Sequence, residues 1–507
     1  MNLLRLFRRI DDGRDKKNQS KHKPSVWEFP QIKKRDSDGY YPIVCPHCMS
    51  HFHIWEVEFR SPMPYLENGQ DHIVNNIEGF PGEIDTRYDD FEMFIGSAVW
   101  ERLRGKVLKI FDEKGEPTGE VTHITLMDKQ NGGADKNGTL IPIMERNARD
   151  FTKKPIRYVI NKYGQLCTDR ICPYCHHQVS NYVGIMPSYN IALIGDIRVG
   201  KAAYLNRLEQ SLLYGGLLGG SLIGHNSDPN YKSWIRSEME LDQTTKEDQP
   251  KYPNQMIDYI MPNTIIFHKN QEQEGFILNL FNFEGSVIER LDCNDNRKML
   301  ISQIYGRMID KMDAFMLMFD AAHFETVRAV FESDEVLKSY INNNSRVQHP
   351  LELLTFFESE YLREQEGIFT KPVAFIMSKS DLIRLAKYKN SDYFQNLTDS
   401  ETFLDTNLKH ERDKTKVDLD DLYACERAIE RFLQESHKDS LLFRRAKDDQ
   451  RNGESLWFAV SSLGDAQDGL ADPVRITEPI EWILWRLGLV QGEGDAIPGG
   501  GNPIRVK

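Results

Sequence analysis

The sequence predicts an α/β protein whose main domain is a doubly wound, mostly parallel sheet, preceded by a small module with paired cysteines. From residue 189 onward, apolar runs typical of buried strands alternate with stretches of helical periodicity. Before this region the motif C-P-x-C occurs twice. We expect a basic flexible segment (1–38), a zinc ribbon with an inserted α+β, mostly β module (39–185), the α/β domain (186–490) and a disordered tail (491–507).

A glycine-rich loop follows the first predicted strand of the α/β domain. The apolar run 191–194 leads into Gly195, and the residues from there to Lys201 match G-x-x-x-x-G-K. A helical pattern follows, with Ala203, Leu205 and Leu208 spaced for one buried face. In such loops backbone N–H groups surround phosphates, the helix dipole favours the anion, and the lysine reaches the terminal phosphates. The alternative is an ordinary glycine turn. The predicted nucleotide-binding residues here are Gly195, Asp196, Ile197, Arg198, Val199, Gly200, Lys201, Ala202 and Ala203.

One position of this loop departs from the pattern. The residue after the lysine is ordinarily Ser or Thr, whose hydroxyl coordinates Mg²⁺, whereas this chain has Ala202. Because a methyl group cannot coordinate a metal, the loop supports phosphate binding better than it supports catalysis.

The paired cysteines predict a metal site. Each C-P-x-C can form a tight knuckle with two thiolates, and two knuckles complete a tetrahedral zinc site from Cys45, Cys48, Cys172 and Cys175. With four cysteines and no open position, this ion would be structural. The alternative is two unrelated turns with reduced thiols. Other residues considered are His51, His53, His176 and His177 as substitute ligands, Cys167 as a spare, and Cys293 and Cys425 as isolated thiols.

The composition is that of a folded globular protein, with 40% hydrophobic and 28% charged residues among 507. No apolar run reaches the roughly 18 residues of a membrane-spanning helix, and arginines among the first ten residues argue against a secretory signal. The net charge of −13 argues against a surface that coats nucleic acid. We therefore expect a cytoplasmic protein with no nucleic-acid partner.

Two segments outside the α/β domain carry weaker patterns. Residues 1–36 are rich in Lys and Arg and could form a short amphipathic helix that docks on a membrane surface or an acidic partner; the alternative is a solvated terminus. The insertion at 49–171 has strand-like runs around 105–111, 121–127 and 156–160. Its role is not predicted.

Further apolar strands of the α/β domain end in polar motifs. Runs at 263–268 and 275–281 predict a hairpin, which ends in N-x-x-G at 282–285. The run 314–319 ends at Asp320, and the run 372–377 ends in S-K-S-D at 378–381. The run 456–460 leads into S-S-L at 461–463, and a last helix is predicted at 478–487. Since parallel sheets bind ligands at the carboxyl ends of their strands, these motifs are expected to meet.

The order of these motifs resembles that of Ras-like P-loop GTPases. The resemblance implies that Asp381, in the position of the N/T-K-x-D aspartate, accepts both guanine N–H donors and that the stem of Lys379 packs over the base. With adenine, the same aspartate would leave polar groups without hydrogen-bond partners, so the motif favours guanine. Ser378 stands where Asn or Thr is usual, and the backbone around Ser462 would contact the guanine oxygen. Further nucleotide-binding candidates are therefore Gly285, Ser378, Lys379, Asp381, Ser461, Ser462 and Leu463.

The chain also resembles the bacterial double-GTPase families of predicted conflict and defence loci. The residues that carry this resemblance lie at 170–177, 190–195, 200–205 and 472–479, with Trp482. The resemblance implies a zinc ribbon fused to a GTPase domain that works with a companion protein encoded nearby, such as a second GTPase or an effector. It does not cover the insertion at 49–171.

Two departures from the GTPase pattern fall on the metal site. The third motif is ordinarily D-x-x-G, whose Asp holds Mg²⁺ through water, and here that residue is Asn282. Together with Ala202, this change puts Mg²⁺ binding and hydrolysis in doubt. Glu284 or Asp320 could bind the metal instead, and Arg198 could stabilise charge in the transition state. Ser286 follows Gly285, at the position where Gln or Glu commonly helps to place the attacking water. The threonine that closes over the γ-phosphate could be Thr244, Thr245 or Thr264.

Two functions from different classes follow from these patterns. The first is a regulatory protein that binds GTP or GDP, with slow or absent hydrolysis, and switches a partner. The alternative is a non-enzymatic scaffold in which the GTPase fold is a relic and the zinc ribbon recognises the partner. An ATPase or kinase fits poorly, because S-K-S-D would then have no role.

Overall fold

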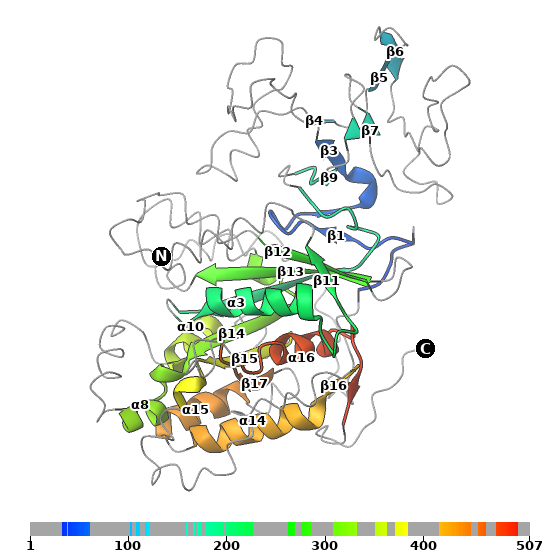
Figure 1. The fold of residues 1–507 in the computed structure, drawn as a ribbon. Coiled ribbons are helices and arrows are strands. Elements are labelled where there is room, and N and C mark those ends of the chain that lie inside the picture. Colours follow the sequence, from blue (N-terminus) through cyan, green and yellow to red (C-terminus); the bar gives the residue numbers. More distant parts are fainter. Residues whose placement is uncertain are drawn as a thin grey trace, which may run out of the picture.

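The computed structural model describes residues 33–37, 39–60, 102–103, 108–111, 117–121, 159–160, 166–167, 170–174, 178–196, 199–226, 262–268, 275–284, 308–331, 350–361, 371–383, 415–434, 436–447, 455–462 and 473–494. Figure 1 shows a layered α/β domain with the cysteine-bearing module beside one end of its sheet. None of the helices in these ranges is both long and apolar enough to cross a membrane.

In the described part of the chain, seven strands form the central sheet, in the spatial order β11-β12-β13-β10-β14-β15-β17 (Figure 1). Among these seven, β12 alone runs against the others. The doubly wound, mostly parallel sheet predicted from the sequence is therefore confirmed, and the predicted hairpin forms β12 and β13. In chain order the strands are β10 (Ser188–Gly195), β11 (Gly224–Asn226), β12 (Asn263–His268), β13 (Gly275–Glu284), β14 (Ala314–Asp320), β15 (Val373–Ser378) and β17 (Ser455–Ala459).

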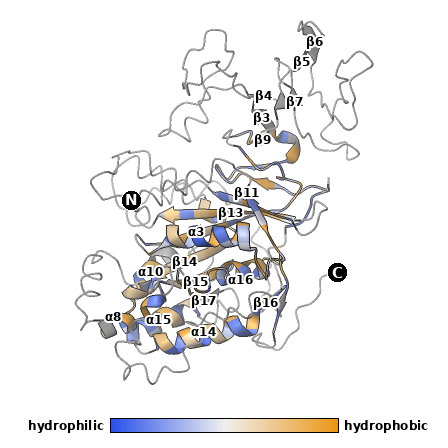
Figure 2. Cartoon of the chain, in the orientation of Figure 1, coloured by the Kyte–Doolittle hydropathy of each residue, from blue (hydrophilic) through white to orange (hydrophobic). Residues whose placement is uncertain are grey.

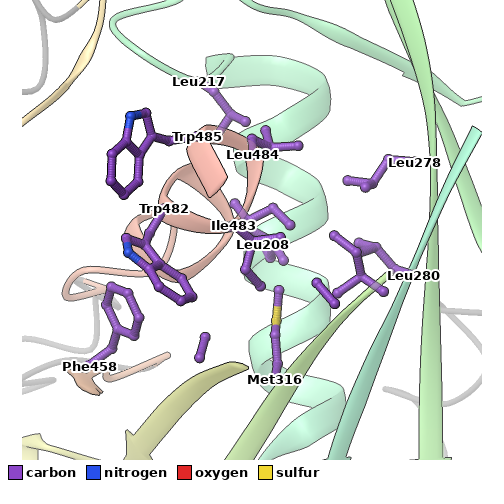
Figure 3. Packing of buried hydrophobic residues seen from close by; sticks show 14 of the residues in the cluster. Leu208, Leu217, Leu278, Leu280, Met316, Phe458, Trp482, Ile483, Leu484 and Trp485 are labelled. Carbon is purple, nitrogen blue, oxygen red and sulfur yellow. The ribbon is translucent and has the colours of Figure 1, made fainter. Parts of the chain in front are cut away.

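One face of the sheet is covered by α3 (Lys201–Gln210), the π-helical turn η2 (Ser211–Gly215) and α16 (Glu478–Arg486). Figure 3 shows Leu208 of α3 and Ile483 of α16 side by side above Leu280 and Met316 of the sheet. Each fully buried side chain of this size stabilises the fold by roughly 1.5–3 kcal/mol. This packing joins the helix after the glycine-rich loop to the last helix of the domain.

The opposite face carries α8 (Glu325–Phe331), α10 (Pro350–Tyr361), α14 (Leu419–Leu433) and α15 (His437–Ala446). At its centre Trp457 stacks on Phe375, with ring centroids 5.0 Å apart, and on Phe443 of α15 at 5.7 Å. Figure 2 shows mainly hydrophobic strands between helices that mix hydrophilic and hydrophobic residues. The strands are therefore buried on both sides, as expected for a parallel sheet.

The cysteine-bearing module packs on the β12–β13 hairpin, toward the end of β12 and the beginning of β13. Its residues Ile43 and Phe52 share one buried cluster with Ile266 of β12 and Ile277 of β13. Of the predicted insertion strands 105–111, 121–127 and 156–160, residues 108–111 form β5, Val121 ends β6 and residues 159–160 form β7. The remaining residues of these three ranges lie outside the described structure. The elements of the module are β1 (Ile43–Val44), β2 (His51–Phe52), η1 (Ile54–Glu56), β3 (Glu58–Arg60), β4 (Arg102–Leu103), β5 (Leu108–Phe111), β6 (Pro117–Val121), β7 (Val159–Ile160), β8 (Leu166–Cys167) and β9 (Arg170–Ile171).

The described structure extends past both predicted terminal boundaries. Lys33, predicted to lie in a flexible segment, places its Nζ 2.8 Å from Asp313 Oδ2, just before β14. At the other end, β18 (Gly492–Glu493) pairs with β16 (Val417–Asp418), within residues predicted to be disordered. Those two predictions were wrong for these residues, because contacts with the domain fix segments whose composition is typical of loops. Residues 1–32 and 495–507 lie outside the described ranges.

The buried face of α3 also differs from the predicted one. Tyr204, Leu208 and Leu212 are fully buried, whereas Ala203 and Leu205 are half-buried. The spacing of four residues puts these three side chains on one stripe. The sequence pattern counted aliphatic side chains and passed over Tyr204, whose hydroxyl donates to the carbonyl oxygen of Ile476, two residues before the last helix.

Candidate functional site

The motifs predicted to bind a ligand lie at one edge of the sheet, where β13, β10, β14, β15 and β17 end. Along this edge Gly195 of β10 is level with Glu284 of β13 and Met318 of β14. Asp320 of β14 is level with Ser378 of β15. Because carboxyl ends of parallel strands form the binding edge of such sheets, the separate motifs converge as predicted.

The glycine-rich loop turns between β10 and α3. Gly195 leaves no room for a side chain, since a Cβ there would lie 2.6 Å from the carbonyl oxygen of Met318. Gly200, directly before α3, has a φ of 92°, which L side chains rarely adopt. Lys201 is buried, and its Nζ donates to the carbonyl oxygens of Gly195 at 2.6 Å and Asp196 at 2.7 Å. The lysine ammonium therefore lies inside its own loop.

Ser378 joins this loop to two strands. Its buried Oγ lies 2.6 Å from the carbonyl oxygen of Val199 in the loop and 3.0 Å from that of Phe319 in β14. A side chain at the end of β15 thus fixes the loop against its neighbours. Ile197 and Arg198, also predicted in this loop, lie outside the described residues.

Lys379 reaches across the loop to an acid. Its Nζ lies 2.5 Å from Asp320 Oδ2, and its Cε lies 3.8 Å from the position a Cβ would take at Gly200. Asp320 is only 1% exposed, and its Oδ1 accepts from Ala322 N at 2.9 Å, at the start of η3 (Ala321–His323). The stem of Lys379 therefore covers the loop, and Asp320 balances its charge.

Asp381 comes three residues after the end of β15, Ser378, and is half-buried. The Ser461 hydroxyl donates to Asp381 Oδ1 at 2.6 Å. The backbone of Ser380 donates to Val460 O at 3.1 Å, so the two strand-end motifs are also joined through their main chains. Ser462 is half-buried beside them, and Leu463 lies outside the described residues.

His323 is a buried residue of this edge that sequence analysis missed. Burial lowers the pKa of its imidazole, and the charge of Asp320 opposes that shift. The ring is therefore neutral near pH 7, and among the described residues its Nε2 has no hydrogen-bond partner. A single histidine after a strand end forms no motif, so the sequence held no signal for it.

The two positions at which GTPases ordinarily hold Mg²⁺, 202 and 282, do not fit that ion in the described structure. Ala202 offers a methyl group, and the neutral Asn282 has a buried Oδ1 that accepts no hydrogen bond from the described part of the chain. Asp320, considered as a replacement ligand, is enclosed and already paired with Lys379. Glu284 ends β13 beside Gly195, while Gly285 and Ser286 lie outside the described residues.

Thr264 is not the threonine that closes over a phosphate, and this candidate was wrong. Its hydroxyl donates to Asn279 Oδ1 at 2.8 Å, and Asn279 donates to Asn190 Oδ1 at 2.8 Å. Asn190 lies five positions before Gly195 in β10, which is about 16 Å away along an extended strand. Thr264 therefore belongs to a polar network at the far edge. Thr244 and Thr245 lie outside the described residues.

Three of the four predicted metal-binding cysteines form a cluster. The Sγ atoms of Cys45, Cys48 and Cys172 lie within 4.8 Å of one another, and those of Cys48 and Cys172 are 3.7 Å apart. Four sulfurs around a tetrahedral zinc ion are about 3.8 Å apart, given Zn–S bonds of about 2.3 Å. This donor set therefore fits zinc. Cys175 lies outside the described residues.

Backbone donors support the same cluster. In each knuckle the N–H two residues after the first cysteine donates to its sulfur at 3.4 Å, His47 to Cys45 and Tyr174 to Cys172. Such donors stabilise thiolate charge. Cys425, by contrast, is buried in α14, where burial raises its thiol pKa, as expected for an isolated thiol.

No family model and no curated protein matches the chain. Among solved structures it is similar to elongation factor SelB from Methanococcus maripaludis with a GTP analogue (10% identity, 60% of this chain, 35% of that chain, TM-score 0.23). It is also similar to the GTP-bound Ski7 GTPase-like domain from S. cerevisiae (13% identity, 60% of this chain, 51% of that chain, TM-score 0.25). A third similar structure is Era from Aquifex aeolicus with GDP and AlF₄⁻ (12% identity, 62% of this chain, 60% of that chain, TM-score 0.25). The chain thus spans 35% to 60% of their lengths.

The class of fold follows from the sheet and its loops. The central strand β10 leads into the glycine-rich loop, β13 ends beside that loop, and β15 and β17 end in S-K-S-D and S-S at the same edge. The domain has the fold of a P-loop GTPase, with a cysteine-bearing module against its sheet.

The close approach at Gly195 predicts a local sensitivity of the loop. Gly195→Ala should lower the free energy of unfolding by about 1–3 kcal/mol, because the new methyl group would collide with the Met318 carbonyl. Gly215→Ala is the matched control, since a Cβ there meets nothing within 4 Å. Urea unfolding of both variants checks this. Equal stabilities would contradict the described approach of β10 to β14.

Proposed function

We propose that this chain is a guanine-nucleotide-binding regulatory protein with impaired GTP hydrolysis, whose nucleotide state switches a partner protein. The observation that carries the proposal is the convergence of Lys201, Lys379 and Asp381 at one edge of the sheet, with Lys379 over the loop. Ser378 and Ser461 hold two of these groups in place. Phosphate-binding and base-reading groups thus lie together.

Asp381 would supply the selectivity for guanine. Guanine presents two neighbouring N–H donors to a carboxylate, whereas adenine presents an amino donor beside an unprotonated ring nitrogen. Facing adenine, the acceptor oxygens meet a lone pair, and an unpaired buried polar group costs roughly 1–3 kcal/mol. The hydrogen bond from Ser461 holds the carboxylate in one orientation, so the penalty is not relieved by rotation.

Hydrolysis would be impaired because the metal lacks its ligands. Ala202 and Asn282 both take positions that coordinate or orient Mg²⁺ in an active site of this class, and Asp320 is already paired with Lys379. Phosphoryl transfer depends on a cation that neutralises developing charge. Glu284, Arg198 and Ser286 remain candidates for a catalytic role.

We propose that the cysteine-bearing module senses the nucleotide site. It packs on Ile266 and Ile277, and β13 continues from there to Glu284, level with Gly195. A shift of this hairpin on nucleotide binding would reach the module directly. We propose that a companion protein, either a second GTPase or an effector, responds to this change. Both proteins would act in the cytoplasm as parts of a bacterial defence system. Contact of residues 1–36 with a membrane or acidic surface belongs to the same proposal.

A non-enzymatic scaffold is the second candidate. The observation that favours it is the pair Ala202 and Asn282, which a relic fold would tolerate. In that case the module alone recognises the partner, and the loop binds no nucleotide.

Nucleotide preference tests the proposal. The purified full chain should bind GDP more tightly than ADP, and Asp381→Asn should weaken GDP binding about tenfold or more, because a carboxamide cannot accept from both donors. Asp310→Asn is the control, because Asp310 is exposed and precedes β14 at the opposite edge. Equilibrium titration gives both affinities. Equal binding of GDP and ADP would refute guanine recognition, and a thermal shift that stays flat with every nucleotide would favour the scaffold.

The missing ligands predict weak dependence on Mg²⁺. Replacing Mg²⁺ by EDTA should change the GDP affinity of the natural chain by less than about threefold, with little phosphate released from GTP. The double variant Ala202→Ser, Asn282→Asp restores both ligand positions and should make GDP binding depend on Mg²⁺. A natural chain that loses GDP in EDTA, or turns over GTP readily, would show that other groups hold the metal.

We also propose that the cysteine cluster holds one structural Zn²⁺, with Cys175 as the fourth ligand. Metal analysis of protein purified without chelator should give about one zinc per chain. Cys45→Ser should lose the metal, because a buried hydroxyl does not replace the thiolate. Cys425→Ala is the control and should keep it. Absence of zinc from the natural chain would overturn this assignment.

A further inference from the structure

A short segment before α16, residues 474–476, touches the base-reading end of the proposed site. We call it the strap. Its Val474 pairs with Ser461 through two backbone hydrogen bonds, from Ser461 N to Val474 O at 3.1 Å and from Val474 N to Ser461 O at 2.8 Å. Ser461 in turn donates to Asp381. The strap therefore sets the position of the residue that orients the base-reading carboxylate.

The strap also touches the phosphate-binding end. The carbonyl oxygen of Ile476 accepts a hydrogen bond from the hydroxyl of Tyr204 at 3.1 Å. Tyr204 is fully buried on α3, one turn after Lys201. Burial holds its pKa above the ordinary range, so the phenol stays protonated and donates. Through Tyr204, the helix that starts at the phosphate-binding lysine is tied to the same three residues.

Arg475 anchors the strap between these two contacts. Its NH1 lies 2.7 Å and 2.8 Å from the two carboxylate oxygens of Glu478 in α16, and 3.0 Å from Asp421 Oδ2 in α14. Its side chain is only 4% exposed. Its φ of 52° is one that residues other than glycine rarely adopt. Such a backbone persists only where the surroundings hold it, and here two carboxylates do so.

We infer that the strap positions the guanine-specificity contact, with Arg475 as its positioning residue. By fixing the strap, Arg475 sets where Ser461 holds Asp381 relative to the phosphate-binding helix. This inference rests on the proposed guanine-nucleotide binding. It gives a role to the motif at residues 472–479, which makes none of the proposed contacts with the nucleotide.

The test compares GDP with IDP, whose base lacks the 2-amino group and so offers Asp381 one donor instead of two. The natural chain should prefer GDP, because the unpaired acceptor weakens IDP binding. Arg475→Met should reduce the ratio of the GDP and IDP affinities by about tenfold while pyrophosphate binding changes little. Loss of stability alone would weaken both nucleotides equally. Arg445→Met is the control, because Arg445 donates to Thr355 Oγ1 at 2.8 Å, in another part of the domain.

A second variant tests the same inference if Arg475→Met does not fold. Tyr204→Phe removes only the hydroxyl that holds Ile476, and it should lower the same ratio. A folded variant of either kind with the natural ratio would overturn the inference while guanine binding stands. If the natural chain binds neither GDP nor IDP, the proposed function fails and this inference fails with it.

Discussion

The hydroxyl of Ser378 is the contact on which the geometry of the site depends. It bonds the glycine-rich loop through Val199 and β14 through Phe319, from a position 179 residues away from the first and 59 from the second. A buried carbonyl left without its partner costs about 1–3 kcal/mol, so the three elements cannot separate freely. The next residue, Lys379, therefore starts from a fixed point and crosses the loop at Gly200.

The charges of this edge are balanced within the protein. Lys201 is solvated by carbonyl oxygens of its own loop, and Lys379 is paired with the nearly inaccessible Asp320. Burying an unpaired charge would be costly, and these contacts offset that cost for both lysines. An incoming phosphate would then compete with short-range contacts of Lys201, and its binding would be accompanied by a rearrangement of the loop.

The sequence predicted what local patterns determine. Uninterrupted apolar runs gave the strands, and polar residues at their ends gave the edge at which Gly195, Asp320 and Ser378 meet. The prediction failed where long-range contacts decide. The network of Thr264 with Asn279 joins neighbouring strands, and the bond from Tyr204 to Ile476 spans 272 residues. No periodicity encodes such pairs, because each partner taken alone is an ordinary polar side chain.

The two candidate metal sites of the chain, the cysteine cluster and the Mg²⁺ position beside the glycine-rich loop, differ in their ligands. A structural ion needs a closed set of ligands, and the clustered thiols approach that arrangement. In this class a hydrolytic ion is held by a hydroxyl oxygen at position 202 and by a carboxylate at position 282, where the chain has a methyl group and a neutral amide. Within the proposed function, nucleotide would therefore act by occupancy rather than by turnover. A ligand shifts a population only through unequal affinity for two states, so the partner must distinguish the loaded chain from the empty one. The hairpin that joins the loop to the cysteine cluster is the element through which that difference would pass.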